Sequence, residues 1–274
     1  MGKILEITQS LLNAMAKCPA QVYYSRIKDL RIPPGVAARK GSSVHKGAEH
    51  IHRVKVAKGI EPPEDEATDA TRDEYMRLIK EEGVFLTPEE QENKSEVLNE
   101  GLNEALSAVK VYRRHIAPTL KEIALIEERL FADIGVGLPL SGKPDVIVDA
   151  TNTDLKTSAK RWVEGTEHLT LQPTTYRLLL KANGFGPLPS RYVILSSMKS
   201  GPKDKSLIFD EGVCCEIRST DRTDAQEEKL INRCAAVAAQ LKHGDFPPGP
   251  PDQWWCTPKF CGYTGICKYY GGNP

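Results

Sequence analysis

The sequence contains no apolar run that approaches the roughly 20 residues needed to cross a membrane. Its first ten residues also lack the long apolar core of a secretory signal peptide. Neither sign of charge is in excess, because 37 Lys and Arg residues balance 37 Asp and Glu residues. Zero net charge argues against a histone-like or tail-driven nucleic-acid binder, although a local basic groove stays compatible with it. We therefore expect a cytoplasmic protein.

The chain also lacks an internal repeat, and its seven cysteines are an odd number. In a cytosolic protein, clustered cysteines indicate metal or redox chemistry more often than disulfides. The 274 residues are ample for a buried core. We interpret residues 1–274 as a single domain, with a helical insertion at 59–118 and a metal-cluster tail at 246–274 that closes onto the N-terminal helix.

Periodicity and breaker residues predict an α/β (α+β) fold in which helices precede a sheet with crossing helices. A first helix is expected within 4–27, interrupted at Cys18-Pro19, and a second from a cap at Gly41–Ser43 to about Lys58. Residues 59–70 are expected to be an acidic linker. The remaining predicted elements are helices at 71–83, 88–117, 172–181 and 223–242, and strands at 123–134, 146–148, 154–158, 191–197 and 213–217.

A predicted hairpin carries the strongest catalytic pattern. Gly142-Lys143-Pro144-Asp145 precedes a β-branched run, and Asp154-Leu155-Lys156 begins nine residues after Asp145. Asp154 and Lys156 leave one face of a strand, so two carboxylates and an ammonium group could converge. Carboxylates suit Mg²⁺, and the carbonyl of Leu155 could add an oxygen ligand. A solvent-facing hairpin with ordinary acids is the alternative, because an isolated D-x-K pattern is common.

Side chains from two predicted helices could complete such a site. His45 lies four and seven residues before Glu49 and His52, on one helical face, and a neutral imidazole could bind the same metal. Gln172 and Tyr176 are four residues apart on the helix that follows the hairpin, so they face the same way. The alternatives are an exposed helical histidine and a polar helix start with an anchoring tyrosine.

Three cysteines near the C-terminus form the other strong pattern. Cys256, Cys261 and Cys267 lie within twelve residues, which suggests a soft-metal site. Zinc or an iron–sulfur cluster commonly takes four ligands, and Cys18 is the natural fourth. The alternative is a set of buried or free thiols, which is how we interpret the remaining cysteines, Cys214, Cys215 and Cys234.

The ordered set of motifs resembles the RecB-like branch of the PD-(D/E)XK nuclease superfamily, close to CRISPR-associated and phage recombination exonucleases with an iron–sulfur cysteine cluster. The resemblance implies a restriction-endonuclease-like central mixed sheet flanked by helices. It implies that Mg²⁺ or Mn²⁺ is bound by His45, Asp145, Asp154 and the carbonyl of Leu155. It also implies catalytic roles for Asp145, Asp154, Lys156, Gln172 and Tyr176. The cysteines it assigns to a [4Fe–4S] cluster are Cys18, Cys256, Cys261 and Cys267.

This chain departs from relatives in several places. The acid before the lysine is Asp154, where glutamate is common, although both occur in the superfamily. Four residues separate Cys256 from Cys261, a wider spacing than in many relatives, which leaves zinc open. Relatives often carry a glutamate before the first strand, and either Glu127 or Glu128 could match it.

We therefore expect a metal-dependent DNA nuclease, an exonuclease acting on single strands or DNA ends. The resemblance places it in recombination, repair or CRISPR adaptation, with proteins of those pathways as partners, in a bacterial cell or a phage-infected host. Lys143, Lys156, Lys160 and Arg161 could meet phosphates, and Trp254 and Trp255 could stack on bases or pack in the core. The alternatives are a nucleic-acid-binding protein without turnover and a zinc-stabilised structural or adaptor protein.

Overall fold

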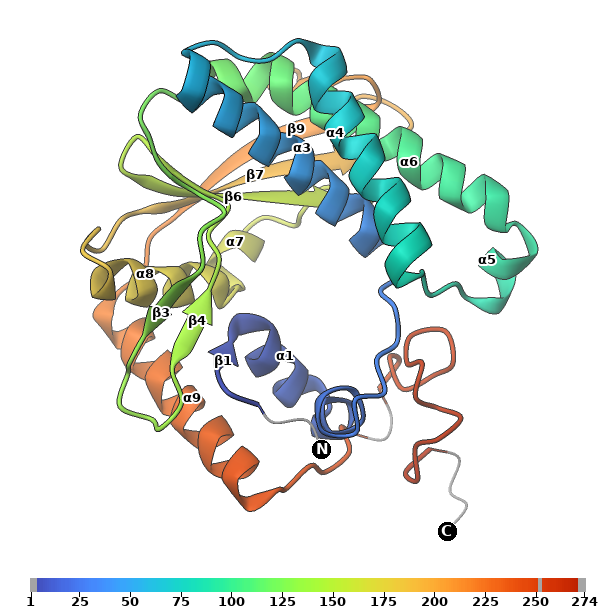
Figure 1. The fold of residues 1–274 in the computed structure, drawn as a ribbon, viewed down its shortest axis with the longest axis vertical. Coiled ribbons are helices and arrows are strands. Elements are labelled where there is room, and N and C mark those ends of the chain that lie inside the picture. Colours follow the sequence, from blue (N-terminus) through green and yellow to red (C-terminus); the bar gives the residue numbers. More distant parts are fainter. Residues whose placement is uncertain (1–3, 251–252, 271–274) are drawn as a thin grey trace.

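The computed structural model describes residues 4–250 and 253–270, and it places a six-stranded mixed sheet at the centre of the molecule (Figure 1). The strand order is β2-β5-β6-β7-β9-β8, in which β6 and β7 are parallel and all other neighbours are antiparallel. Their bounds are β2 Ile123–Ile126, β5 Val146–Val148, β6 Thr151–Ser158, β7 Ser190–Ser197, β8 Ile208–Asp210 and β9 Val213–Thr220. This arrangement confirms the predicted mixed α/β fold.

Three long helices cover one face of this sheet: α3 Val36–Lys58, α4 Glu64–Arg77 and α6 Lys94–Val111. The short helical segments Leu78–Glu82 and α5 Pro88–Glu92 lie between α4 and α6, and two further segments, Tyr112–Ile116 and Ala117–Thr119, lead from α6 to β2. Buried side chains such as Val44 and Val109 join Leu155 and Val193 in one core. Gly47 lets α3 approach its neighbours closely, because a Cβ there would lie 2.1 Å from Oγ1 of Thr71.

The other face is covered by α8 Gln172–Ala182, α9 Asp224–His243 and a small sheet ordered β1-β4-β3. The small sheet consists of β1 Ile7–Thr8, β4 Leu140–Gly142 and β3 Leu130–Ala132, and the short α7 spans Thr166–Leu169. Leu12, Leu140, Leu179 and Leu230 belong to a second core between these elements. Among the described residues, no helix is long and apolar enough to cross a membrane.

The N-terminal helices and the described part of the C-terminal tail lie side by side (Figure 1). The N-terminal helices are α1 Gln9–Lys17 and α2 Pro19–Val22, followed by a π-helical turn at Tyr23–Ile27. The amide of Ala20 donates to the carbonyl of Pro247 at 3.0 Å, and the hydroxyl of Tyr263 donates to the carbonyl of Leu30 at 2.8 Å. These contacts attach the described part of the tail, up to residue 270, to the start of the chain.

Several predicted boundaries are wrong for reasons of tertiary packing. Helix α3 begins at Val36 and runs through Gly41, which is not part of a cap. Glycine is used there because a Cβ would lie 3.2 Å from Oγ1 of Thr157 on β6. The linker is short, since α4 begins at Glu64, where three acidic residues favour a helix N-terminus. The predicted strand 123–134 is broken, and β1 and β8 were not predicted.

Candidate active site

The hairpin forms as predicted, and its ladder ends where the candidate site begins. Strands β5 and β6 pair from Val146–Thr153 to Val148–Thr151, with residues 149 and 150 in the left-handed turn. Backbone pairing of β6 with β5 ends at Thr153. Past this point, the amide of Leu155 on β6 donates a 2.7 Å hydrogen bond to Oδ2 of the Asp145 side chain. This contact fixes Asp145 beside β6, next to Asp154.

His45, Glu127 and Asp145 form a compact group of candidate metal ligands. Nδ1 of His45 lies 3.2 Å from Oδ1 of Asp145 and 3.7 Å from Oε1 of Glu127. One donor atom from each residue lies within 4.8 Å of the others. Glu49 and His52 share the predicted face of α3, but Glu49 is paired with Lys46 and Arg53 and His52 bonds Tyr112. Only His45 of this face therefore joins the group.

The structure distinguishes Glu127 from Glu128. The backbone at Glu127 is left-handed, with φ of 48°, and it interrupts the path between β2 and β3. The side chain of Glu127 is 8% exposed and ion-paired with Lys143 at 2.5 Å, whereas Glu128 is exposed to solvent. Glu127 is thus the glutamate that lies in the site.

His45 and Asp145 shift each other's pKa values. Burial alone would lower the pKa of His45, but the charge and hydrogen bond of Asp145, with help from Glu127, raise it to about 10. Burial likewise opposes ionisation of Asp145, but the charge and hydrogen bond of His45, together with the charge of Lys156 and the amide of Leu155, lower that pKa below its ordinary value. In the metal-free protein, the imidazolium therefore occupies a cation position between two carboxylates.

Asp154 and Lys156 lie beside this group on β6, as predicted. Nζ of Lys156 lies 2.5 Å from Oδ2 of Asp154, and Nε2 of Gln172 donates to Oδ1 of Asp154 at 2.7 Å. Burial and the nearby charge of Asp145 raise the pKa of Asp154 to about 7, against the opposing effect of Lys156. Two carboxylates with strongly different pKa values are typical of a catalytic centre.

Gln172 and Tyr176 connect α8 to both halves of the hairpin motif. Gln172 donates to the hydroxyl of Tyr176 at 3.0 Å, and that hydroxyl donates to the carbonyl of Lys143 at 2.9 Å. The close approach also explains Gly142, because a Cβ there would lie 3.0 Å from Cε1 of Tyr176 and 2.8 Å from Cδ1 of Leu179. The glycine and the tyrosine of the two motifs are therefore packed against each other.

A neighbour of Lys156 was missed by the sequence analysis. Tyr192 pairs with Asp154 across the parallel strands, is 1% exposed, and has its ring centroid 5.8 Å from Nζ of Lys156. Its hydroxyl shares a 2.7 Å hydrogen bond with Thr170, and its ring packs against Trp162 with centroids 5.0 Å apart. The ring thus lies against the ammonium group on one side of the site.

The four predicted cysteines line one cavity of about 400 Å³ between the N-terminal helices and the tail. Gly249 donates its amide to Sγ of Cys18 at 3.2 Å, and Gln21 donates to Sγ of Cys261 at 3.3 Å. The cavity lining includes the full set, Cys18, Cys256, Cys261 and Cys267. By contrast, Cys214 and Cys215 on β9 and Cys234 on α9 are buried, as expected of structural thiols.

The cysteine sulfurs are spread more widely than the ligands of one zinc ion. A tetrahedral zinc with Zn–S bonds of about 2.3 Å holds its sulfurs about 3.8 Å apart. Among the described residues, the only three-ligand group within 4.8 Å is that of His45, Glu127 and Asp145. Burial, followed by the charges of the other three thiolates, raises the pKa of Cys256. In the part of the chain that the structure describes, no three of the four cysteine sulfurs lie within 4.8 Å of one another.

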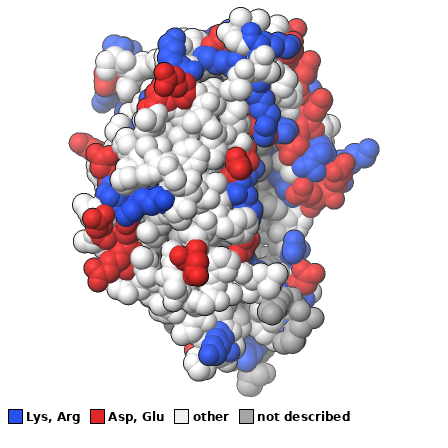
Figure 2. All heavy atoms as spheres, turned by 60° about the vertical axis from the view of Figure 1, so that its left-hand side comes forward, with Lys and Arg blue, Asp and Glu red and all other residues white. Residues whose placement is uncertain are grey.

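The predicted basic rim is thin. Arg161 is bound by Glu216 through hydrogen bonds of 2.7 and 3.0 Å, and Lys143 is paired with Glu127. Figure 2 shows positive and negative side chains interspersed on the face it displays, with broad uncharged areas between them. Trp254 is 64% exposed and packs edge-on against Phe260, so it is not a core residue.

Comparison with known proteins places these motifs in a family. The family model of the PD-(D/E)XK nuclease superfamily matches residues 6–268. No curated protein sequence matches the chain. Among solved structures, a "Putative exonuclease" from Eubacterium rectale superposes with a TM-score of 0.58 at 12% identity, covering 92% of this chain and 86% of that one. At this identity the likeness shows the shared fold.

Proposed function

The chain belongs to the PD-(D/E)XK nuclease superfamily, and from this premise we propose that it is a metal-dependent DNA exonuclease acting on single strands or DNA ends. The observation that carries the proposal is the convergence of His45, Glu127 and Asp145 beside the Asp154–Lys156 pair. Hydrolysis of a phosphodiester needs a cation site, a positioned water and a compensating positive charge, and these side chains can supply all three.

The donor set fits Mg²⁺ or Mn²⁺. Two carboxylates and one imidazole lie within reach of one ion, and Oδ2 of the buried Asp154, which is ion-paired with Lys156, lies beside them. We assign His45, Glu127, Asp145 and Asp154 as ligands and the carbonyl of Leu155 as a further oxygen. When bound, such an ion acidifies a coordinated water and stabilises charge that builds up on the phosphate.

The remaining side chains orient the reacting groups. Lys156, paired with Asp154, would direct the attacking water and offset the charge of the phosphate. Gln172 holds Oδ1 of Asp154, so Oδ2 faces Lys156 and the metal site. Tyr176 holds the backbone of Lys143, two residues before Asp145. These contacts pre-organise the carboxylates before the substrate arrives.

We propose that the cysteine cavity holds a [4Fe–4S] cluster. Four thiolates surround about 400 Å³, and amide donors from Gly249 and Gln21 point at two of the sulfurs, as is common for cluster ligands. The cluster would join the first helix to the tail across nearly the whole chain and so limit the freedom of the unfolded state. Visible absorption of the purified protein tests this, because a colourless, zinc-loaded protein would contradict it.

The proposed activity is tested with end-labelled linear single strands, linear duplexes and circular single strands, each with Mg²⁺ or Mn²⁺. We expect metal-dependent degradation of linear DNA, no degradation of circles, and loss of activity in Lys156→Ala. Glu127→Gln should lose most activity, while Glu128→Gln, one residue away and solvent-exposed, should keep it.

Three results would contradict the proposal. Equal activity of wild type and Lys156→Ala would point to a contaminating nuclease, and binding of DNA without turnover would favour a non-catalytic member of the family. Degradation of circular strands would show an endonuclease and remove the exonuclease assignment. Roles in recombination, repair or CRISPR adaptation, with partners from those pathways, remain proposals that follow from the family alone.

A further inference from the structure

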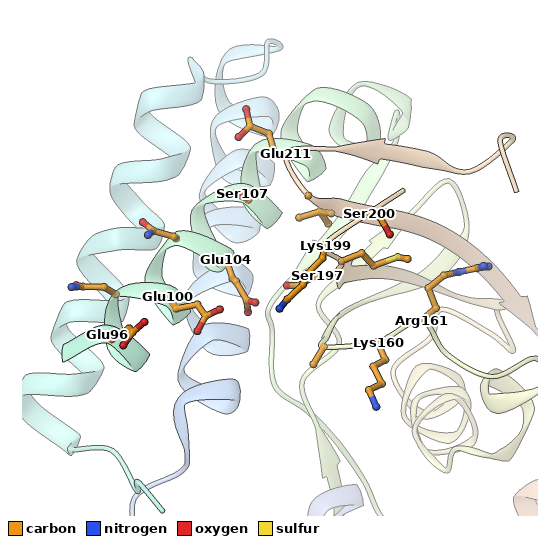
Figure 3. A pocket seen from close by; sticks show the side chains of 16 residues that line it. Glu96, Glu100, Glu104, Ser107, Lys160, Arg161, Ser197, Lys199, Ser200 and Glu211 are labelled. Carbon is orange, nitrogen blue, oxygen red and sulfur yellow. The ribbon is translucent and has the colours of Figure 1, made fainter. Parts of the chain in front are cut away.

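A large, open cavity lies outside the candidate active site. Its volume is about 1220 Å³, above the roughly 300–1,000 Å³ of small-molecule sites, so it suits a segment of a polymer. It opens between helix α6 and the segments that follow β6 and β7. Figure 3 shows glutamates of α6 on one side and Lys160, Arg161 and Lys199 on the other.

The two walls carry unpaired charges of opposite sign. Lys160 and Lys199 are exposed, and among the described residues neither ammonium group has an ion-pair partner. Glu96 and Glu100 on the opposite wall are also exposed and unpaired by the same measure. The other charged lining residues are already matched: Arg161 to Glu216, Glu104 to Lys40, and Glu211 to Lys110 and Arg114.

The basic wall continues directly from the catalytic strand. β6 carries Lys156 and ends at Ser158, and the cavity lining begins at the next residue. Strands β6 and β7 are parallel and adjacent, so the segments that hold Lys160 and Lys199 both start from the carboxyl ends of these strands, on the same side of the sheet. At about 3.3 Å per residue, Lys160 lies at most about 13 Å along the chain from Lys156. A bound polymer could therefore reach from the cavity to the candidate metal group.

We propose that this cleft selects single-stranded over double-stranded DNA. The phosphates of one strand would follow the wall of Lys160 and Lys199. Glu96 and Glu100 face that wall and would repel the phosphates of a second strand. The inference rests on the proposed nuclease function and assigns its strand choice to four residues outside the metal group.

The lysines of one wall and the glutamates of the other should affect DNA binding in different ways. Each lysine–phosphate contact on a single strand contributes about 0.7 to the dependence of log affinity on log salt, so two lysines account for about 1.4. Repulsion by the glutamates is screened over about 8 Å at physiological ionic strength, so it acts on a strand that enters the cleft and not on distant DNA. The lysines should set affinity, and the glutamates should set discrimination.

The first experiment measures how tightly fluorescein-labelled dT20 and a 20-base-pair duplex bind to the full chain, between 50 and 200 mM NaCl. The chain carries Lys156→Ala so that the DNA is not degraded. Adding Lys160→Ala with Lys199→Ala should weaken dT20 binding about tenfold at 100 mM NaCl and reduce the salt slope by about 1.4. The matched control is Lys58→Ala with Lys229→Ala, two exposed lysines outside the cavity lining, which should change neither quantity.

The second experiment measures DNA degradation by the double variant Glu96→Gln with Glu100→Gln, in a chain that is otherwise native. The ratio of single-strand to duplex degradation rates should fall by about fivefold, mainly because duplex degradation rises. An unchanged ratio of degradation rates overturns the cleft proposal, and so does an unchanged dT20 affinity in the lysine variant. The nuclease assignment stands in either case, and the cleft is then better explained as a surface that binds a protein. If the wild-type chain neither binds nor degrades either DNA, the proposed function itself has failed.

Discussion

Binding of a metal ion to the His45 group should release a proton from the protein. In the metal-free state, burial opposes protonation, but the charge and hydrogen bond of Asp145, with the hydrogen bond of Glu127, raise the pKa of His45 to about 10, so the imidazole is protonated at pH 7.5. Imidazole must be neutral to bind a metal ion, so this proton has to leave. Asp154, with a pKa of about 7, is about one-quarter protonated at pH 7.5 and adds a smaller share.

The expected release is therefore slightly more than one proton for each ion bound at pH 7.5. Removing the proton from His45 at this pH costs about 3 kcal/mol. Because the metal-free form holds the proton and the metal-bound form does not, affinity should increase with pH. The increase should be about tenfold per pH unit between pH 7 and pH 9.

Calorimetric titration with Mn²⁺ in two buffers of different ionisation enthalpy measures the number of protons released. His45→Gln should reduce that number by about one, since the glutamine has no proton to lose. His50→Gln, five residues along α3 and outside the ligand group, is the matched control and should leave it unchanged. Tight Mn²⁺ binding with no proton release, or equal release from His45→Gln, would refute the assignment of His45 as a ligand.

Three further predictions concern the surroundings of the site. Gly142→Ala should destabilise the protein by about 1–3 kcal/mol in urea unfolding and lower kcat, because the new Cβ displaces Tyr176; wild-type behaviour would refute the packing argument. Tyr192→Leu should lower kcat about tenfold with KM unchanged, because it removes the ring that lies against Lys156. Tyr192→Phe keeps this ring and should retain activity. An equal loss in both variants would exclude a role for the ring contact. Cys261→Ser should lower both metal content and Tm, and unchanged metal content would remove this cysteine as a ligand.

Much of the site could be predicted because its motifs are local. The hairpin follows from a β-branched run and a turn, and the placement of Gln172 and Tyr176 follows from helical spacing. Residues that are neighbours on one strand or one helix keep that relation in any fold. The family resemblance then ordered these local pieces into one expected site, and the structure brings their side chains together.

The parts that could not be predicted depend on contacts between distant segments. Glu127 and Glu128 are equivalent in sequence, and only the left-handed backbone at Glu127 directs that side chain inward. Tyr192 is 36 residues from Lys156, and its position depends on the register of two parallel strands. Gly41 resembles a helix cap, but it lies inside α3 because that helix packs closely on β6.

The most direct test of the nuclease assignment is the Mn²⁺-dependent hydrolysis of linear single-stranded DNA by Asp145→Asn. The substitution keeps the size of the side chain and an oxygen that can accept the hydrogen bond from Leu155, but it removes the charge that faces His45. We predict a loss of kcat of at least about 100-fold with Tm within a few degrees of wild type. A variant that hydrolyses DNA at the wild-type rate would contradict the account.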